Sequence, residues 1–575
     1  MKNTLLVLAV LAPVSMHANA FEFDTSSDWQ IRWDNTFKGN IMSRVESQDK
    51  SVYDPNYSNP TRVAAGLADD ATYSVDRSDG GLVSTRIDLL SEVDVVWRET
   101  LGLRISGAGW YDFAYDDSDH PENGPTKGFP SAYSTWGSLS VKPGEYTDDA
   151  EDLHYRGGEL LDAFVFANID VGDVSANVRA GRHTIYWGQS LLTTGAIHGF
   201  AGSMAALDLA KGFGSPGSEA KELFMPNGKV SSVVQLTDNL TLNAFYAFEF
   251  VPLRWAEGGT YFSLAELLTE NSEFLTIAPG TGGEWGVDSP RVGYKSTDYK
   301  SKDSGDWGIN VQYYVERWGL ETSFIYMNNT DRLTSGLYAT SGDTTSGEDA
   351  LARETNALLL GHYGWVYKDD IDTFGISLSR QMFDISWGAD LVYRKNNALN
   401  PDLNAALSTP VDGNAVDPGN YPGATGDSMH IVLNGLGLLT PDWGLWDGGR
   451  YIIEATFSKL DDFGDLEERA NPRIHEDRWT SHIAAVFAPT WYSVLVGWDL
   501  TLPMSISYAI DGEQTPNSAG GNEEVGNGSI GIQFLIDQVW DVSAKYNVYF
   551  GPQGNGTSAW IKDRDNVALT VKRTF

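Results

Sequence analysis

The stretch that decides the fold is IDLLSEVDVVW-RET-LGLRISGAGWY, residues 87–111. Apolar side chains recur at alternate positions on both sides of Arg98-Glu99-Thr100, and acids, Arg or small residues fill most positions between them. A period of two is typical of β-strands, and two such runs joined by three residues predict an antiparallel hairpin. Each run has about the 9–11 residues that a tilted strand needs to cross a bilayer.

The same pattern repeats along the chain, with an alternation of turn lengths. Further short turns are expected near 171–173, 237–239, 316–318, 380–382, 488–490 and 537–539. Long polar stretches lie between them, at roughly 39–82, 114–159, 183–228, 251–305, 329–370, 394–427, 460–479, 509–527 and 551–564. A soluble sandwich would share the period of two, but strict alternation of short turns with long loops is typical of bacterial outer-membrane barrels.

We therefore expect an all-β protein, a transmembrane antiparallel β-barrel of the outer membrane of a Gram-negative bacterium. The pattern gives about 18 strands, an even number as closure of a single chain requires, and 16 or 14 if marginal segments merge. Val567, Leu569 and Val571 share one face of a final strand that ends at Phe575. A terminal Phe of this kind resembles the signal by which barrel assembly machinery recognises such proteins. With this strand running down to the periplasm, every long loop falls outside the cell.

Composition excludes several functions. The 575 residues include no Cys, which excludes disulfides and thiolate sites, and 40 basic against 78 acidic residues give a formal charge of −38. Such a chain repels phosphates, so no nucleic-acid partner is expected. The nine His are scattered, and Gly426-Asp427-Ser428 is not accompanied by a pattern of catalytic partners. We expect no enzyme activity, no cofactor and no metal site.

The first twenty residues are typical of a secretory signal. Lys2 supplies the positive end, residues 5–14 the apolar run, and Ala18-Asn19-Ala20 a small-x-small cleavage site. The expected organisation is a signal peptide at 1–20 and a single barrel domain at 21–575. No later run approaches the roughly 18 apolar residues of a transmembrane helix.

The third long loop, 183–228, differs from the others. It is rich in Gly, Ala and Ser, and it carries two short helical patterns, at 204–211 and 218–224. Its apolar residues are too many for a loop in water: Leu192, Ile197, Phe200, Met204, Leu207 and Leu209. We expect this partly helical loop to fold into the lumen as a hatch or constriction. The alternative is packing on the outer rim.

Charged residues on the early strands are expected to face the lumen, since a charge facing lipid costs about 2–4 kcal/mol at mid-depth. They alternate with apolar positions and comprise Arg86, Asp88, Glu92, Asp94, Arg104, Asp162 and Arg179. Two interpretations stay open. The residues form a ladder that sets selectivity or guides a solute, or they are cross-strand pairs that hold a wide barrel open.

Two runs carry a resemblance to a known family. Residues 181–190 read Gly-Arg-x(4)-Trp-Gly-x-Ser, with Arg182 and Trp187 at the fixed positions, and residues 216–222 read Pro-Gly-x-Glu-x-Lys-Glu, with Glu219 and Lys221. Both resemble an uncharacterised proteobacterial outer-membrane protein family, a domain of unknown function. Matches at 375–377, 393–396 and 499–503 extend the resemblance over most of the mature chain. Members of that family often accompany genes for the metabolism of hydrophobic compounds, which implies a channel or exporter for such molecules.

The expected function is therefore an outer-membrane channel for hydrophobic or amphipathic small molecules, fatty-acid- or steroid-like, with Arg182, Trp187, Glu219 and Lys221 as candidates for loop placement or gating. An acidic, cation-preferring general porin and a surface receptor or scaffold without an open pore are the alternatives. Expected partners are outer-membrane lipid and lipopolysaccharide, the barrel assembly machinery through Phe575, and a small hydrophobic solute. Nine acids against three basic residues in 114–156 predict a solvated acidic rim, or a site for divalent ions shared with lipopolysaccharide.

Overall fold

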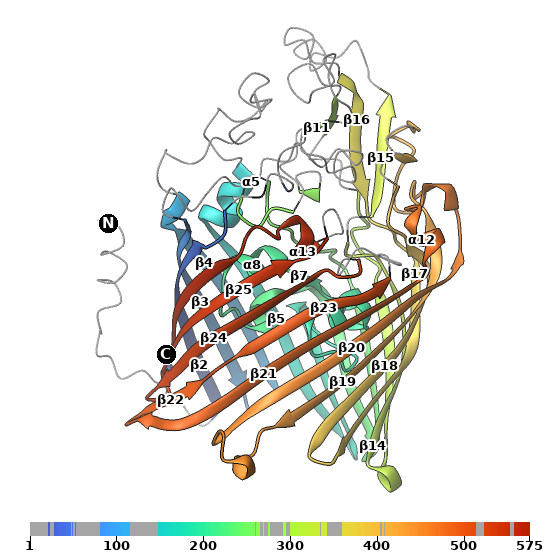
Figure 1. The fold of residues 1–575 in the computed structure, drawn as a ribbon. Helices are drawn as coiled ribbons and strands as arrows, with labels where there is room; N and C mark the ends of the chain where they lie inside the picture. Colours follow the sequence, from blue (N-terminus) through green and yellow to red (C-terminus); the bar gives the residue numbers. More distant parts are fainter. Residues whose placement is uncertain are drawn as a thin grey trace.

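The fold was determined from a computed structural model of the chain (Figure 1). The residues that the structure describes are 21–23, 28–47, 49, 52, 81–115, 148–258, 260–264, 268–269, 274–276, 291–294, 300–333, 335–341, 359–402, 405–406, 409–512, 522–552 and 557–575. The expected signal peptide and most of the first and second external loops lie outside these residues. No helix within the described ranges is long and apolar enough to cross a membrane.

The dominant element is a closed antiparallel barrel in which the described residues form 18 strands. The strands are β2 (Trp29–Arg44), β3 (Leu82–Trp97), β4 (Leu101–Asp112), β5 (Arg156–Val171), β6 (Val174–His183), β9 (Asn227–Thr237), β10 (Leu240–Ala247), β13 (Trp307–Val315), β14 (Leu320–Asn329), β17 (Ile371–Met382), β18 (Ile385–Ala398), β19 (Thr425–Leu438), β20 (Gly448–Phe463), β21 (Trp479–Leu495), β22 with β23 (Trp498–Thr501 and Met504–Gly512), β24 (Gly526–Ile536), β25 (Trp540–Phe550) and β26 (Asn566–Thr574). β22 and β23 count as one strand because both lie between β21 and β24. The expected fold class and strand number are confirmed.

The barrel closes between its first and last strands. β2 pairs with β26 from Thr36↔Thr574 to Arg44↔Asn566. The backbone of Phe575 continues the pairing by exchanging two hydrogen bonds with Asn35, at 2.7 and 2.8 Å. Closure leaves the spanning sheet without an unpaired edge, as a bilayer requires.

Alternation sorts the side chains between lipid and lumen. Leu89, Ile105, Val165 and Phe324 are about half exposed on the outer face, whereas inward positions such as Lys38 are almost fully buried. The outward Arg573, near the periplasmic end of β26, lies over the ring of Trp540 at 4.7 Å, so its charge sits at the interface while its stem packs on an aromatic side chain.

The turns follow the expected alternation, with two misplaced boundaries. The turns at 98–100, 171–173, 237–239, 316–318 and 537–539 lie within one or two residues of their predicted places. The turn predicted at 380–382 is wrong: β17 continues to Met382, and the chain turns at Phe383 and Asp384, both with positive φ. The turn predicted at 488–490 is wrong: β21 continues through Pro489 to Leu495. Pro489 lies opposite Gly449, whose φ of 131° marks an irregular position in β20. The carbonyl of Pro489 accepts a hydrogen bond from the Leu502 N–H at 3.0 Å. A proline at such a break does not end the strand.

The remaining elements are short. Outside the barrel wall, the strands are β1 (Phe21–Phe23), β7 (Ala206–Leu207), β8 (Phe224–Met225), β11 (Phe274–Thr276), β12 (Arg291–Tyr294), β15 (Gly336–Ser341) and β16 (Leu359–Val366). The helices are α5 (Asp148–Ala150), α6 (Thr193–His198), α7 (Ala201–Met204), α8 (Leu209–Gly214), α9 (Ala220–Leu223), α12 (Arg473–Glu476) and α13 (Thr557–Trp560). Single turns of other helix types are η3 (Phe113–Tyr115), η4 (Glu151–Tyr155), η7 (Glu316–Trp318), η8 (Pro441–Trp443) and η9 (Glu467–Arg469). β15 and β16 rise above the barrel at the external end, whereas α8 and β7 lie within its outline (Figure 1).

Candidate functional site

Residues 184–226, here the lumen segment, connect β6 to β9 and carry α6 to α9. The segment contacts inward side chains of β18–β20 on one side of the barrel and of β2, β3 and β26 on the other. It therefore lies across the interior.

Two carboxylates of the wall hold the start of the lumen segment. The backbone N–H of Gln189 donates to both oxygens of Asp390, at 3.1 and 2.9 Å. Leu191 and Leu192 donate to separate oxygens of Glu454, at 2.7 and 3.1 Å. Because both carboxylates are almost fully buried, these are charge-assisted bonds in a site with little water to compete.

Arg394 of β18 binds the end of α6. Its guanidinium donates to the carbonyl oxygens of Ile197, His198 and Gly199, at 3.2, 3.2 and 2.8 Å. These include carbonyls that a helix leaves unpaired at its C-terminus, where a cation is favourable. The ring of His198 lies beside that of His430 at 5.3 Å between centroids.

The other side of the segment rests on lysines. Lys38 of β2, 2% exposed, donates to Ser218 Oγ at 2.8 Å and lies 3.4 Å from Glu222. Lys221 pairs with Glu92 at 2.5 Å, and Lys572 of β26 pairs with Glu219 at 2.6 Å. Lys572, next to the Glu219 carboxyl, lowers the pKa of that carboxyl against the opposing effect of burial, which is the largest single influence.

The sequence-predicted residues of the two motif runs are thus distributed around the segment. Trp187 is buried against Phe200 and Phe245, with the Phe245 ring edge-on at 5.3 Å. Glu219 caps α9 and Lys221 lies within it, both in ion pairs with the wall.

Arg182 lies elsewhere. On β6 it faces the side opposite to the inward His183, and its neighbours Gly228 and Ala163 flank the outward residues Val230 and Val165. It pairs with Glu249 and donates to the Pro226 carbonyl at 3.1 Å. The alternation of β6 therefore turns Arg182 away from the lumen, at the base of the segment. Its part in loop placement or gating stays a prediction.

The charges predicted for the lumen all lie on inward positions, and most are paired. Asp94 and Arg104, directly opposite on β3 and β4, form two bonds of 2.7 Å. Arg86 forms an ion pair with Asp88 at 2.9 Å, and Glu92 forms one with Lys221 of the lumen segment. Arg179 lies over the Phe164 ring at 5.6 Å, and Asp162 is the remaining member of the set. One of these pairs, Asp94–Arg104, joins neighbouring strands as one interpretation required, and this pairing does not exclude a role in selectivity.

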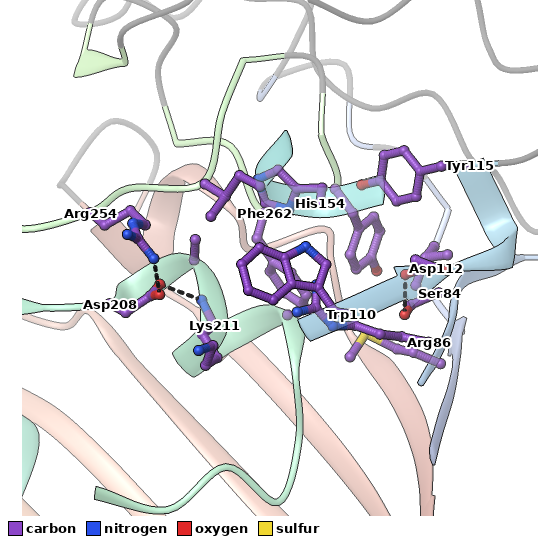
Figure 2. Close-up of a pocket in the computed structure, with 16 residues that line it drawn as sticks. Ser84, Arg86, Trp110, Asp112, Tyr115, His154, Asp208, Lys211, Arg254 and Phe262 are labelled. Atoms are coloured by element: carbon purple, nitrogen blue, oxygen red, sulfur yellow. Dashed lines mark hydrogen bonds and ion pairs between the residues drawn. The ribbon is translucent and has the colours of Figure 1, made fainter. Parts of the chain in front are cut away.

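A cluster of charges joins the segment to the external end. Arg254 binds both Glu159 and Asp208, at 2.9 and 2.8 Å, and Lys211 binds Glu159 at 2.8 Å. Figure 2 shows Asp208, Lys211 and Arg254 of this cluster near Trp110. These four residues line a small chamber of about 40 Å³. Arg86 and Lys211 lie over the Trp110 ring, at 5.1 and 5.6 Å.

His154 forms part of the wall of that chamber. Its Nε2 accepts the Glu257 N–H at 3.1 Å, so this nitrogen is unprotonated. Burial, followed by the charges of Arg86 and Arg254, lowers the pKa of His154 to about 3.

A larger cavity opens above the chamber and shares Trp110, Leu153 and Arg254 with it. This outer cavity has a volume of about 530 Å³, the size of many small-molecule sites. Much of its wall is apolar, formed by Trp110, Leu153, Met225, Val251, Pro252, Leu253, Trp255, Leu268 and Tyr367. Its acidic members are Asp149, Asp152, Glu159 and Glu257. Sequence reasoning did not find this cavity, since it is assembled from four external loops.

No group of three or more His, Asp or Glu that could hold a metal ion occurs among the residues with a described position. The site is therefore defined by a cavity, a charged cluster and a segment across the lumen.

A closed barrel with an apolar outer surface defines the class: this is an integral β-barrel protein of the Gram-negative outer membrane. The chain belongs to the family described as protein of unknown function (DUF1302), which it matches over residues 1–575. No curated protein matches the sequence.

Several solved structures resemble this chain over nearly its whole length at low sequence identity. Acinetobacter baumannii OccAB4 is 8% identical over 96% of this chain and 99% of its own, with a TM-score of 0.40. Pseudomonas aeruginosa OccK3 (OpdO) is 9% identical over 95% of both chains, with a TM-score of 0.39. Salmonella typhi OmpF, in complex with daunomycin, is 8% identical over 96% of this chain and 100% of its own, with a TM-score of 0.36.

Proposed function

We propose that this protein is a channel through which hydrophobic or amphipathic small molecules, fatty-acid-like or steroid-like, cross the outer membrane. The observation that carries the proposal is the outer cavity of about 530 Å³, whose apolar wall lies at the external end of the barrel next to the lumen segment. Lipopolysaccharide excludes apolar solutes, so such a molecule needs a protein path with an apolar lining. A cavity of mixed apolar and charged lining suits a solute with an apolar body and a polar head.

In this proposal the lumen segment is the gate. Trp187 anchors its start in the aromatic cluster, Glu219 and Lys221 hold its far side through ion pairs, and Arg182 fixes its base. The ion pairs with Lys221 and Lys572 are partly exposed, and such pairs contribute only about 0–1 kcal/mol each. That side can therefore release at little cost, while the inward charges of β3–β6 line a polar wall below.

The test is conductance of the purified protein in planar bilayers, together with solute uptake by proteoliposomes. The intact protein is compared with a variant lacking 200–224, which removes α7 to α9, and with a control lacking 466–477, the external loop that carries α12. A heat-dependent shift in electrophoretic mobility confirms that each variant forms a closed barrel.

We expect the intact protein and the control to be electrically silent or to open briefly, and the variant lacking 200–224 to conduct steadily. We also expect a hydrophobic solute to enter proteoliposomes only when the protein is present. Steady cation-selective conductance of the intact protein would overturn the gated channel in favour of a general porin. Silence of all variants without solute uptake would overturn it in favour of a receptor.

A further inference from the structure

The charge of the outer cavity narrows the class of solute. Of its lining residues, Asp149, Asp152, Glu159 and Glu257 are acids and only Arg254 carries a fixed positive charge. The Arg254 guanidinium bridges Glu159 and Asp208, and Lys211 binds Glu159 as well. These four groups neutralise one another, so Arg254 does not offset the charge of the other acids of the lining.

Two of those acids face water at the cavity. Asp149 and Asp152 lie one helical turn apart, at the junction of α5 and η4, and both are exposed. Neither forms an ion pair with any part of the chain that the structure describes. Partial burial, followed by repulsion from Asp148 and Asp152, raises the pKa of the Asp149 carboxyl. A positive charge placed between these carboxylates would relieve that repulsion.

The apolar part of the lining suits the rest of such a molecule. Leu153, Leu253, Trp255 and Tyr367 line the same cavity as the two carboxylates. Aromatic faces attract cations as well as apolar groups, and Trp110 already carries two cations within 6 Å of its ring. The cavity thus offers an apolar wall and an acidic rim to one molecule.

We propose, on the basis of the proposed function, that the outer cavity takes amphiphiles with a cationic head, an amine on an apolar body, and disfavours carboxylate amphiphiles. Within the proposed class of amphipathic solutes, this favours amines and disfavours fatty acids themselves. The acidic charge of the whole chain, −38, acts in the same sense by raising the local concentration of cations at the external face.

The experiment measures equilibrium binding by calorimetry to the full-length protein in nanodiscs of zwitterionic phosphatidylcholine, with empty nanodiscs subtracted. The three probes have eight carbons each and differ in the head group: octylamine, 1-octanol and octanoate, at pH 7. The variant is Asp149→Asn with Asp152→Asn. Its control, Asp173→Asn with Asp238→Asn, makes the same change of charge in two periplasmic turns far from the cavity.

We expect octylamine to bind about tenfold more tightly than 1-octanol, and octanoate more weakly than 1-octanol. The cavity variant should bring octylamine to the level of 1-octanol without changing 1-octanol binding, and the control should behave as wild type. Equal binding of octanoate and octylamine, or a preference that survives in the cavity variant, overturns the inference. If this order of binding holds while bilayers and proteoliposomes show no passage, the channel is overturned and the cavity stands as the binding site of a receptor.

Discussion

Glu454→Gln isolates what holds the lumen segment in place. Leu191 and Leu192 donate their N–H groups to different oxygens of this carboxylate, which also accepts the Gly195 N–H. A glutamine can accept from only one of them, and its NH₂ group then faces the other N–H. The substitution keeps the size of the side chain, so any effect arises from the altered hydrogen bonds and the lost charge.

The expected cost follows from these two bonds. A hydrogen bond to a charged group contributes about 1.5–3 kcal/mol, and an unsatisfied buried donor costs about 1–3 kcal/mol. Release of the segment from the wall should therefore become easier by about 2–4 kcal/mol, which raises the open population roughly 30- to 700-fold. Because Asp390 and Arg394 still hold the neighbouring backbone, the barrel itself should remain folded.

Hydrogen–deuterium exchange of the protein in nanodiscs measures this directly, in the peptides that contain 189–199. Glu476→Gln, an exposed position in α12, is the matched control and should leave exchange unchanged. Exchange in 189–199 that is as slow in Glu454→Gln as in wild type would refute the argument. It would mean that packing of Phe200 and Trp187, and not the carboxylate, holds the segment.

Two further predictions concern the opposite side and the external chamber. Lys38→Met leaves Glu222 buried without its cation and should lower the stability of the fold by about 3–5 kcal/mol. Lys221→Met removes a partly exposed pair and should lower it by about 1 kcal/mol or less. The temperature at which the heat-dependent electrophoretic shift occurs measures both changes, and an equal change in that temperature for the two variants would contradict the assignment. The pKa of His154 is lowered to about 3 in the fold, whereas an exposed His binds a proton below about pH 6.5. Between these pH values the unfolded state therefore binds more protons than the folded state. Local stability should fall as the pH drops from 6.5 toward 3, by at most about 1.4 kcal/mol per pH unit. Exchange in 148–158, corrected for the intrinsic rate at each pH, should show this loss in wild type and not in His154→Gln, and the same pH slope in both proteins would exclude His154 as its cause.

The barrel was accessible from sequence because lipid and lumen impose their pattern locally. Alternation assigns each strand by itself, and the lengths of the turns assign the sides of the membrane. The error at 488–490 has a specific cause, because Pro489 taken alone predicts a turn. In the barrel, its missing N–H is tolerated because Gly449 lies opposite it on β20. On the other side, β21 faces the break between β22 and β23. Whether a proline ends a strand depends on the neighbouring strand, which sequence spacing does not reveal.

The site was accessible only in part, because its bonds join residues far apart in the chain. Glu454 lies 263 positions from Leu191, and Arg394 lies 195 from Gly199. The inward side of β3 to β6 was found because its charges interrupt apolar runs. Asp390 and Glu454 interrupt apolar runs on β18 and β20 in the same way, so the sequence also indicated inward charges there. The sequence spacing does not indicate that these carboxylates bind the backbone of the apolar loop at 183–228.

The two sides of the lumen segment differ in a way that bears on how it would move. On β18–β20 it is held through its backbone by groups that are almost fully buried, where each lost bond leaves a buried charge or amide unpaired. On β2, β3 and β26 two of the three lysine contacts are partly exposed, and water replaces them when they break. A segment attached in this way pivots on its buried side. Passage would therefore open along β2, β3 and β26, beneath the outer cavity that meets the same segment through Arg254 and Asp208.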